Sequence, residues 1–146
     1  MYQVTKTYGN EEGLSCVFRQ WRAMSHCSKL HGYSLGFRFT FQCGDEDLTE
    51  EGWVIDFGGL DRLRQHLHET FDHKMILDRH DPLYKHFRDL AAGTDAIEIS
   101  TFEEIGCEAF AKYMYNYTNV YVSSRIVSVE CFEHKGNSAI YMSERK

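Results

Sequence analysis

The sequence has little basic charge and no long apolar run. Its 146 residues contain 16 lysines and arginines against 22 aspartates and glutamates, which gives a formal net charge of −6. A nucleic-acid binder needs an excess of basic residues to neutralise phosphates, so nucleic acid is not an expected partner. No segment approaches the ~18 consecutive apolar residues of a membrane span, and the first ten residues lack the apolar centre of a secretion signal. We therefore expect a cytoplasmic protein with no membrane partner.

The cysteines are few and irregularly spaced. There are five of them, and no two are separated by two residues as in a CxxC pair. An odd number without a repeating spacing favours reduced thiols over a disulfide framework. At least one of these thiols is therefore a candidate for chemistry.

Length and composition point to one domain. A chain of 146 residues with 42% hydrophobic residues is long enough for one core and too short for two. We expect a single domain over residues 1–146. The high aromatic share, 14%, falls largely on alternating positions and favours a β-rich core.

The hydrophobic pattern predicts strands and helices in one order. In residues 33–43, aromatic and aliphatic side chains alternate with polar ones or glycine, which predicts a half-buried strand. Further strands are expected at 14–22, 94–100, 125–133 and 137–142, a buried extended segment at 52–57, and helices at 58–71, 78–93 and 102–120.

This order predicts an α+β fold with a four-stranded antiparallel sheet and helices on one face. Such a sheet leaves its edge strands unpaired, so we expect subunits to associate into an oligomeric barrel.

The stretch HCSKLHGYSL, residues 26–35, gathers groups that can carry chemistry. Cys27 lies beside His26, four residues before His31 and near Lys29, and such neighbours favour the thiolate. A lone cysteine is nevertheless more often an inert buried residue. His31 and Tyr33 share one face of the strand, but a neutral phenol is a weak metal ligand, and a histidine hydrogen-bonded in a turn explains His31 as well.

Five other residues are weaker candidates taken alone. In the adjacent pair Asp72 and His73, the carboxylate can orient the imidazole for acid/base work, although a solvated loop explains the pair equally well. Glu108 lies near a helix start, where it also complements the dipole. Glu130 lies within an apolar strand, where a carboxylate either binds two parallel N–H donors, as on a pterin or guanine ring, or faces outward. Arg22 belongs to a small basic patch that suits phosphate or is simply a solvated edge.

Five motifs occur in a specific order: CSKLHG, GWVIDFGGL, FDHKMIL, GCEAFA and SVECFE. In this order they resemble the 6-pyruvoyl-tetrahydropterin synthase and 6-carboxy-tetrahydropterin synthase family, over nearly the whole chain. The resemblance implies a tunnelling fold: sheets assembled into barrels, a homo-oligomer such as a hexamer, and active sites between subunits. It also implies a pterin substrate, 7,8-dihydroneopterin triphosphate. The bacterial branch converts it to 6-carboxy-tetrahydropterin, acetaldehyde and triphosphate on the route to 7-deazaguanines such as queuosine, and the position of Cys27 is similar to that branch.

The resemblance also assigns roles by position. Cys27 matches the cysteine that abstracts a proton from the substrate side chain. Asp72 and His73 match the dyad that works opposite it. Glu130 matches the carboxylate that anchors the pterin ring, and Glu108 matches the glutamate of a Pro-Thr-Ser-Glu-like motif whose other residues are replaced here.

The sequence departs from the family at the metal. The family holds zinc through three histidines, and here Arg22 and Tyr33 stand at two of those positions, leaving His31. His26 is the candidate that joins His31 and Cys27 in a rearranged zinc site. Alternatively, Arg22 replaces the metal charge while Tyr33 donates a hydrogen bond. A third interpretation is a pocket that binds a pterin or purine without synthase activity. A 6-pyruvoyl-tetrahydropterin synthase-type reaction on the same substrate also stays open.

Overall fold

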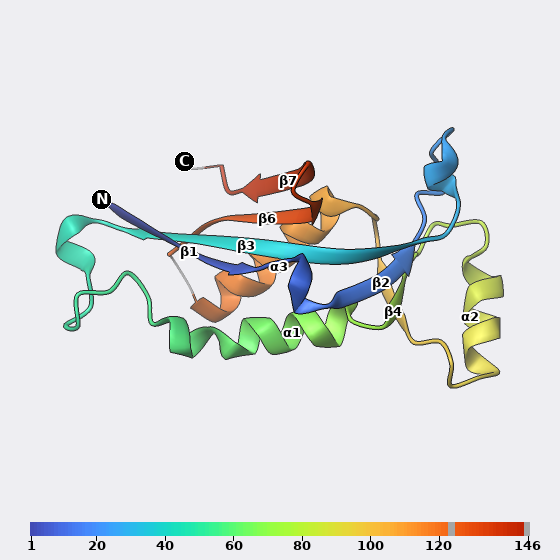
Figure 1. Cartoon of the computed structure of the whole chain (residues 1–146), viewed down its shortest axis with the longest axis horizontal. Helices are drawn as coiled ribbons and strands as arrows, with labels where there is room; N and C mark the ends of the chain where they lie inside the picture. The colour runs from blue at the N-terminus through green and yellow to red at the C-terminus, as the bar shows by residue number, and fades with distance from the viewer. Residues whose placement is uncertain (123–124, 145–146) are drawn as a thin grey trace.

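The computed structural model describes residues 1–122 and 125–144, which form one sheet with helices packed against it (Figure 1). The strands are β1 (Tyr2–Tyr8), β2 (Leu14–Phe18), β3 (His31–Cys43), β4 (Lys74–Asp78), β5 (Ile99–Phe102), β6 (Ile126–His134) and β7 (Asn137–Met142). The helices are α1 (Asp61–Phe71), α2 (Tyr84–Ala92) and α3 (Cys107–Val122). Short 3-10 turns are η1 (Asn10–Glu12), η2 (His26–Ser28), η3 (Asp45–Asp47) and η4 (Phe57–Leu60).

The long strand β3 organises the sheet. β2 pairs with the first half of β3, from Phe18 opposite His31, and β1 pairs with its second half, from Tyr8 opposite Phe37. On the other side of β3 lies β6, which in turn pairs with β7, and all of these pairs are antiparallel. Beyond β2 the sheet continues through β4 to β5, and both of these pairs are parallel.

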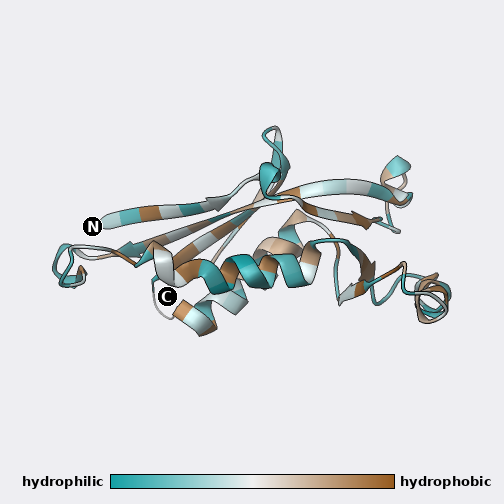
Figure 2. Ribbon diagram, turned by 60° about the horizontal axis from the view of Figure 1, so that its bottom comes forward, coloured by the Kyte–Doolittle hydropathy of each residue, from teal (hydrophilic) through white to brown (hydrophobic). Residues whose placement is uncertain are grey.

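The core lies between β3 and the helices α1 and α3. Alternate side chains of β3 are fully buried: Leu35, Phe37, Phe39 and Phe41. Phe71 at the end of α1 joins the layers, because its ring lies 5.1 Å from that of Phe37 and 5.2 Å from that of Phe110 on α3. Figure 2 shows the apolar stripes of both helices on one side of the sheet. α2 has no buried residue and lies at one end of the molecule (Figure 1).

The prediction of a four-stranded antiparallel sheet is wrong in two respects. The described residues form seven strands, and two strand pairs are parallel. The strands β1 and β4 were not predicted, because β1 is polar at most positions and β4 is a five-residue run directly after a helix. Parallel neighbours need a crossover connection, and α2 supplies it between β4 and β5. Helices α1 and α3 do cover one face, as expected.

Several predicted segments have different bounds. The strand expected over 94–100 is β5 at Ile99–Phe102, and the helix expected over 102–120 is α3 at Cys107–Val122. The strand expected over 14–22 ends at Phe18, because Arg19 turns away and pairs with Asp81. The helix expected over 78–93 begins at Tyr84, since the carboxylates of Asp78 and Asp81 accept from the backbone N–H groups of His80 and Leu83 and hold a turn before it. The segment 52–57 is a loop in which only Val54 is buried.

No helix among residues 1–122 and 125–144 has the length and apolarity that crossing a bilayer requires.

Candidate active site

His31 and Tyr33 form a hydrogen-bonded pair at the start of β3. The Nδ1 atom of His31 lies 2.8 Å from the carbonyl oxygen of Lys29. A carbonyl oxygen only accepts, so Nδ1 carries the proton in this hydrogen bond and, in the neutral ring, Nε2 is the acceptor. The hydroxyl of Tyr33 then donates to Nε2. The two side chains are thus locked in one arrangement with a defined direction of donation.

Tyr33 is held in its protonated form. Burial first, and then negative charge on Glu133 and on the sulfur atoms of Cys27, Cys107 and Cys16, raises the pKa of the phenol to about 12. The groups whose charge raises this pKa come from four different elements. Cys16 comes from β2, Cys27 from η2, Cys107 from the start of α3 and Glu133 from β6. Four elements therefore converge on one end of the sheet.

Cys27 lies in a fixed turn at this end. Its backbone N–H donates to the Oγ atom of Ser25 at 3.3 Å, and its carbonyl accepts from the N–H of Gln20 at 2.8 Å. The side chain is half-buried, unlike those of the other four cysteines, which are buried. Cys27 is therefore the thiol that solvent and a ligand can reach.

Gln20 links this turn to the start of α3. A methyl group built on Gly106 would lie 3.1 Å from the Nε2 atom of Gln20 and 3.2 Å from the Oε2 atom of Glu108, so both side chains border Gly106. Gly106 has φ +136°, a conformation that favours glycine. The structure thus brings Glu108 to the same end as Cys27, His31 and Tyr33. Sequence reasoning missed Gln20, which follows the end of β2 without a motif of its own.

Glu130 lies on the opposite face of the sheet from Tyr33. It stands opposite Arg38 in the β3–β6 register, and its Oε2 atom accepts from Arg38 Nη1 at 2.8 Å. Glu133, three residues further, lies at an irregularity in the β6–β7 register and contributes to the negative charge around Tyr33. Glu130 therefore does not face the end of the sheet where Cys27, His31 and Tyr33 lie, and its expected role as ring anchor beside them does not fit this geometry. Sequence reasoning missed Glu133, which lies three residues after Glu130 in the same motif SVECFE.

Asp72 and His73 form a second group, at the end of α1. Asp72 Oδ1 lies 2.6 Å from His73 Nδ1, and its Oδ2 lies 3.2 Å from His68 Nδ1. Partial burial raises the pKa of Asp72, but the hydrogen bonds with His73 and His68 outweigh it and leave the pKa below its usual value. The network continues from His68 Nε2 to Glu12 at 3.0 Å, and Arg64 pairs with Glu12. His68 and Glu12 belong to no motif and were missed.

The imidazole of His73 is both oriented and accessible. His73 has φ 55°, in the left-handed region that few non-glycine residues adopt, and its backbone N–H donates to the carbonyl of Ser15 at 2.6 Å. Its side chain is 85% exposed. The strained backbone at His73 thus places its imidazole in solvent and against the Asp72 carboxylate. This arrangement suits acid/base chemistry.

The two groups lie apart within one chain. His73 is fixed to Ser15, whereas His31 pairs with Phe18, three residues further along β2. Three residues of an extended strand span roughly 10 Å. Cys27 lies beyond Phe18, at the level of Gln20.

Arg22 and His26 lie away from the His31–Tyr33 pair. The Arg22 guanidinium stacks over the ring of Trp21 at 4.3 Å, and Arg22 borders a pocket of about 390 Å³ together with Gln20 and Glu104. His26 is exposed in η2. No hydrogen bond or ion pair among the described residues joins either side chain to His31 or Tyr33.

The chain is similar over most of its length to a known protein family. The sequence model of 6-pyruvoyl tetrahydropterin synthase matches residues 9–144. The chain belongs to that family. It is 28% identical over 140 residues to the 6-carboxy-5,6,7,8-tetrahydropterin synthase of Aquifex aeolicus, an alignment that covers 90% of this chain and 85% of that protein.

Solved structures of other proteins share the fold. An uncharacterised protein of Wolinella succinogenes superposes with a TM-score of 0.78 at 19% identity, covering 98% of each chain. The 6-pyruvoyltetrahydropterin synthase of Plasmodium vivax superposes with a TM-score of 0.64 at 13% identity, covering 99% of this chain and 98% of that one. The α+β tunnelling fold expected from the motifs is therefore correct, whereas the strand count was not.

The residues of this chain do not fit the three-histidine zinc site that the family implies. Tyr33 is a neutral phenol, and both ring nitrogens of His31 are engaged in hydrogen bonds. At the remaining position, Arg22 carries a positive charge that repels a cation. Within the described part of the chain, no three histidine, cysteine, aspartate or glutamate side chains are placed to hold a metal ion.

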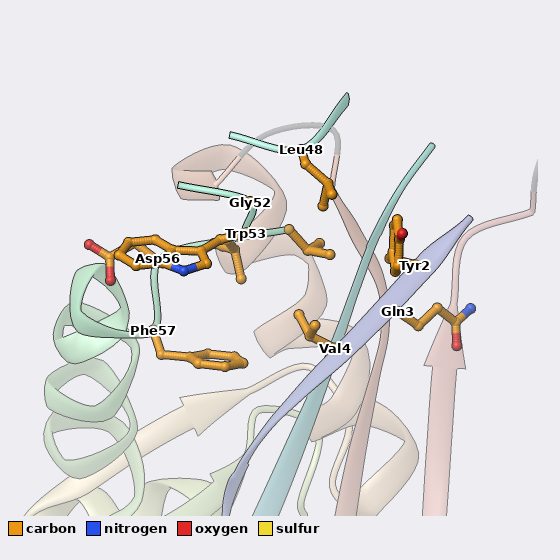
Figure 3. Close-up of a pocket in the computed structure, with 10 residues that line it drawn as sticks. Tyr2, Gln3, Val4, Leu48, Gly52, Trp53, Asp56 and Phe57 are labelled. Carbon is orange, nitrogen blue, oxygen red and sulfur yellow. The ribbon is translucent and has the colours of Figure 1, made fainter. Parts of the chain in front are cut away.

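A larger pocket lies elsewhere. A pocket of about 450 Å³ lies between β1 and the segment that leads into η4, where Leu48, Trp53 and Phe57 lie across from Tyr2 and Val4 (Figure 3). This pocket contains none of the candidate catalytic residues. Its lining is mainly apolar, and we assign it no part in the chemistry.

Proposed function

We propose that the protein is a 6-carboxy-5,6,7,8-tetrahydropterin synthase-like lyase. It converts 7,8-dihydroneopterin triphosphate to 6-carboxy-tetrahydropterin, acetaldehyde and triphosphate, a step towards 7-deazaguanine compounds such as queuosine. The observation that carries this proposal is the strained, exposed His73 held against Asp72 at 2.6 Å. A protein that only binds a pterin needs no oriented imidazole of this kind. The Aquifex aeolicus relative carries the name of this activity.

Each candidate has a role in this reaction. Cys27, the half-buried thiol, abstracts a proton from the substrate side chain. His73 works opposite it as the acid/base group, and Asp72 orients its ring and stabilises the imidazolium. Glu108 and Glu133 supply carboxylates at the same end of the sheet as Cys27, where the amidine-like edge of a pterin offers two parallel N–H donors. Arg22 supplies positive charge for the triphosphate.

A second copy of the chain completes the site in this proposal. Cys27 and His73 lie apart in one subunit, so a neighbour must bring its own Asp72 and His73 to Cys27. Strand pairing between subunits is available, because the outer edges of β1 and β7 have no partner among the described strands. A closed barrel covers such edges, and family resemblance favours a hexamer.

Two alternatives are each supported by one observation. The loss of two zinc-binding histidines favours a pterin- or purine-binding protein without synthase activity. The matching family model is named for 6-pyruvoyl tetrahydropterin synthase, which favours that reaction on the same substrate. The product distinguishes all three functions.

The test is product identification by mass spectrometry after incubation with 7,8-dihydroneopterin triphosphate. We expect 6-carboxy-tetrahydropterin and acetaldehyde from the wild-type protein. Cys27→Ala and His73→Gln each remove a proton-transfer group, so each is expected to lower kcat by 10²-fold or more. His86→Gln on the exposed face of α2 serves as the matched control and keeps full activity. Unchanged substrate, or 6-pyruvoyl-tetrahydropterin as the product, refutes the proposed lyase.

A further inference from the structure

The His31–Tyr33 pair stands where the family implies metal ligands, and it has the parts of a proton relay. His31 Nδ1–H is fixed on the Lys29 carbonyl, and Nε2 accepts the hydrogen bond of the Tyr33 hydroxyl. The oxygen of that hydroxyl keeps a lone pair for a further donor. The pair is therefore arranged to receive a hydrogen bond at Tyr33 and to pass a proton inward to His31.

The ring that carries this hydroxyl is held by stacking on a buried neighbour. Tyr33 stacks on Phe18 with ring centroids 4.0 Å apart, and Phe18 is itself fully buried. Tyr33 is only half-buried, however, so its hydroxyl borders the same end of the sheet as Cys27. The phenol is thus rigid and still open to a ligand.

We propose that His31 and Tyr33 form a metal-independent relay that binds a hydroxyl group on the substrate's side chain and takes its proton. This inference rests on the proposed function and names the chemistry that replaces the family's zinc in this chain. It also names the feature of the ligand that the pair recognises, a hydroxyl on the carbon chain attached to the pterin ring.

The proton balance of the relay is closed. The substrate O–H bond breaks as its proton passes to the Tyr33 oxygen, while the Tyr33 proton passes to His31 Nε2. The substrate oxygen keeps the electron pair, and the imidazolium that forms on His31 is stabilised by its Nδ1–H hydrogen bond to Lys29. No electrons are exchanged, so no oxidant or reductant is needed. The proton returns along the same path when the product oxygen is reprotonated.

A purely structural role for the pair is the alternative, and ligand binding separates the two. We would measure the affinity of wild type and Tyr33→Phe for neopterin, whose side chain carries hydroxyls, and for pterin, which has no side chain. The relay predicts that Tyr33→Phe weakens neopterin binding by about tenfold and leaves pterin binding unchanged. Equal effects on both ligands, or no effect on either, overturn the proposal.

Tyr113→Phe is the matched control. Its hydroxyl also contacts a histidine, His66 Nε2 at 2.9 Å, but this pair joins α1 to α3. We expect its affinities for both ligands to equal those of the wild type. A tenfold loss of neopterin affinity in this variant as well attributes the effect to folding and overturns the relay.

The metal is tested separately by atomic spectrometry after incubation with zinc and dialysis. We expect no retained zinc in the wild-type protein and turnover that a chelator does not lower. One zinc per chain in the wild type, lost in His31→Gln, overturns the metal-independent relay. A wild-type protein that forms no product refutes the proposed lyase and the proton transfer, while the neopterin comparison still decides whether the pair binds the hydroxyl.

Discussion

The ring of Tyr33 lies flat against that of Phe18, with an angle of 3° between the planes. Phe18 in turn meets Phe110 of α3 edge to face, at 5.4 Å and 83°. These contacts connect the start of β3 to the helix layer through one buried ring. The position of the Tyr33 hydroxyl therefore depends on Phe18.

Replacing Phe18 by leucine tests this dependence. Phe18→Leu removes the ring contacts with Tyr33, Phe110 and His31 and leaves a partly filled space, so we expect the free energy of unfolding to fall by about 1 to 2 kcal/mol. We also expect weaker neopterin binding, because Tyr33 loses its support. Phe41→Leu, equally buried at the far end of β3, is the control. It should lose similar stability in urea titration with unchanged neopterin affinity; a loss of affinity in both variants contradicts a specific role for Phe18.

The two glutamates of SVECFE give a prediction with an internal control. Glu133 lies near Tyr33, whereas Glu130 is paired with Arg38 on the other face. If a carboxylate at the Tyr33 end binds the pterin ring, Glu133→Gln weakens pterin affinity by about 10-fold or more, since a hydrogen bond to a charged group is lost. Glu130→Gln changes affinity less than twofold. Fluorescence titration with pterin measures both, and the opposite ranking restores Glu130 as the ring anchor.

Sequence patterns predicted those parts of the fold that depend on local periodicity. The alternation in 33–43 and the apolar stripe of α1 are strong, so β3 and α1 were found. β1 was not found, because it is a mostly exposed strand without a clear hydrophobic pattern. Its stability comes from pairing with β3. The motifs identified Cys27, Asp72 and His73 as candidates, and the family resemblance implied active sites between subunits, but no local pattern gave the distance between these residues within one chain. Contacts such as His68 with Glu12 join residues far apart in sequence and leave no local pattern.

Gly36 explains a close approach within the sheet. A methyl group at Gly36 would lie 2.2 Å from Cε2 of Phe132, whose ring covers this position from β6. Gly36→Ala therefore displaces Phe132, and we expect the free energy of unfolding to fall by about 1 to 3 kcal/mol. At Gly32 in the same strand, the nearest atom is the Cys16 carbonyl oxygen at 3.9 Å. Gly32→Ala should stay within about 0.5 kcal/mol of wild type in the same urea titration; equal losses contradict the packing argument.

The His68 network predicts a stability that depends on pH. His68 lies between Glu12 and Asp72, with Arg64 on Glu12 and His73 on Asp72. The hydrogen bond to Glu12 raises the pKa of His68 above its ordinary 6.5, and the hydrogen bond from His68 lowers that of Glu12 below 4.5. The His68 contribution is therefore complete below pH 6.5 and lost as the pH rises through the raised pKa. The Glu12 contribution is complete above pH 4.5 and lost as the pH falls through the lowered pKa.

Both contributions are complete together between about pH 4.5 and 6.5, a window that follows from the two directions of shift. His68→Gln should lower the free energy of unfolding by about 1 kcal/mol at pH 5.5 and by clearly less at pH 8.5, where His68 has lost its charge in the wild type as well. Urea titration at the two pH values measures the difference. His86→Gln, an exposed histidine on α2, should shift stability equally little at both. If His68→Gln lowers the free energy of unfolding equally at pH 5.5 and 8.5, the ring contributes by packing alone. In that case its charge does not stabilise the end of α1, where Asp72 holds His73.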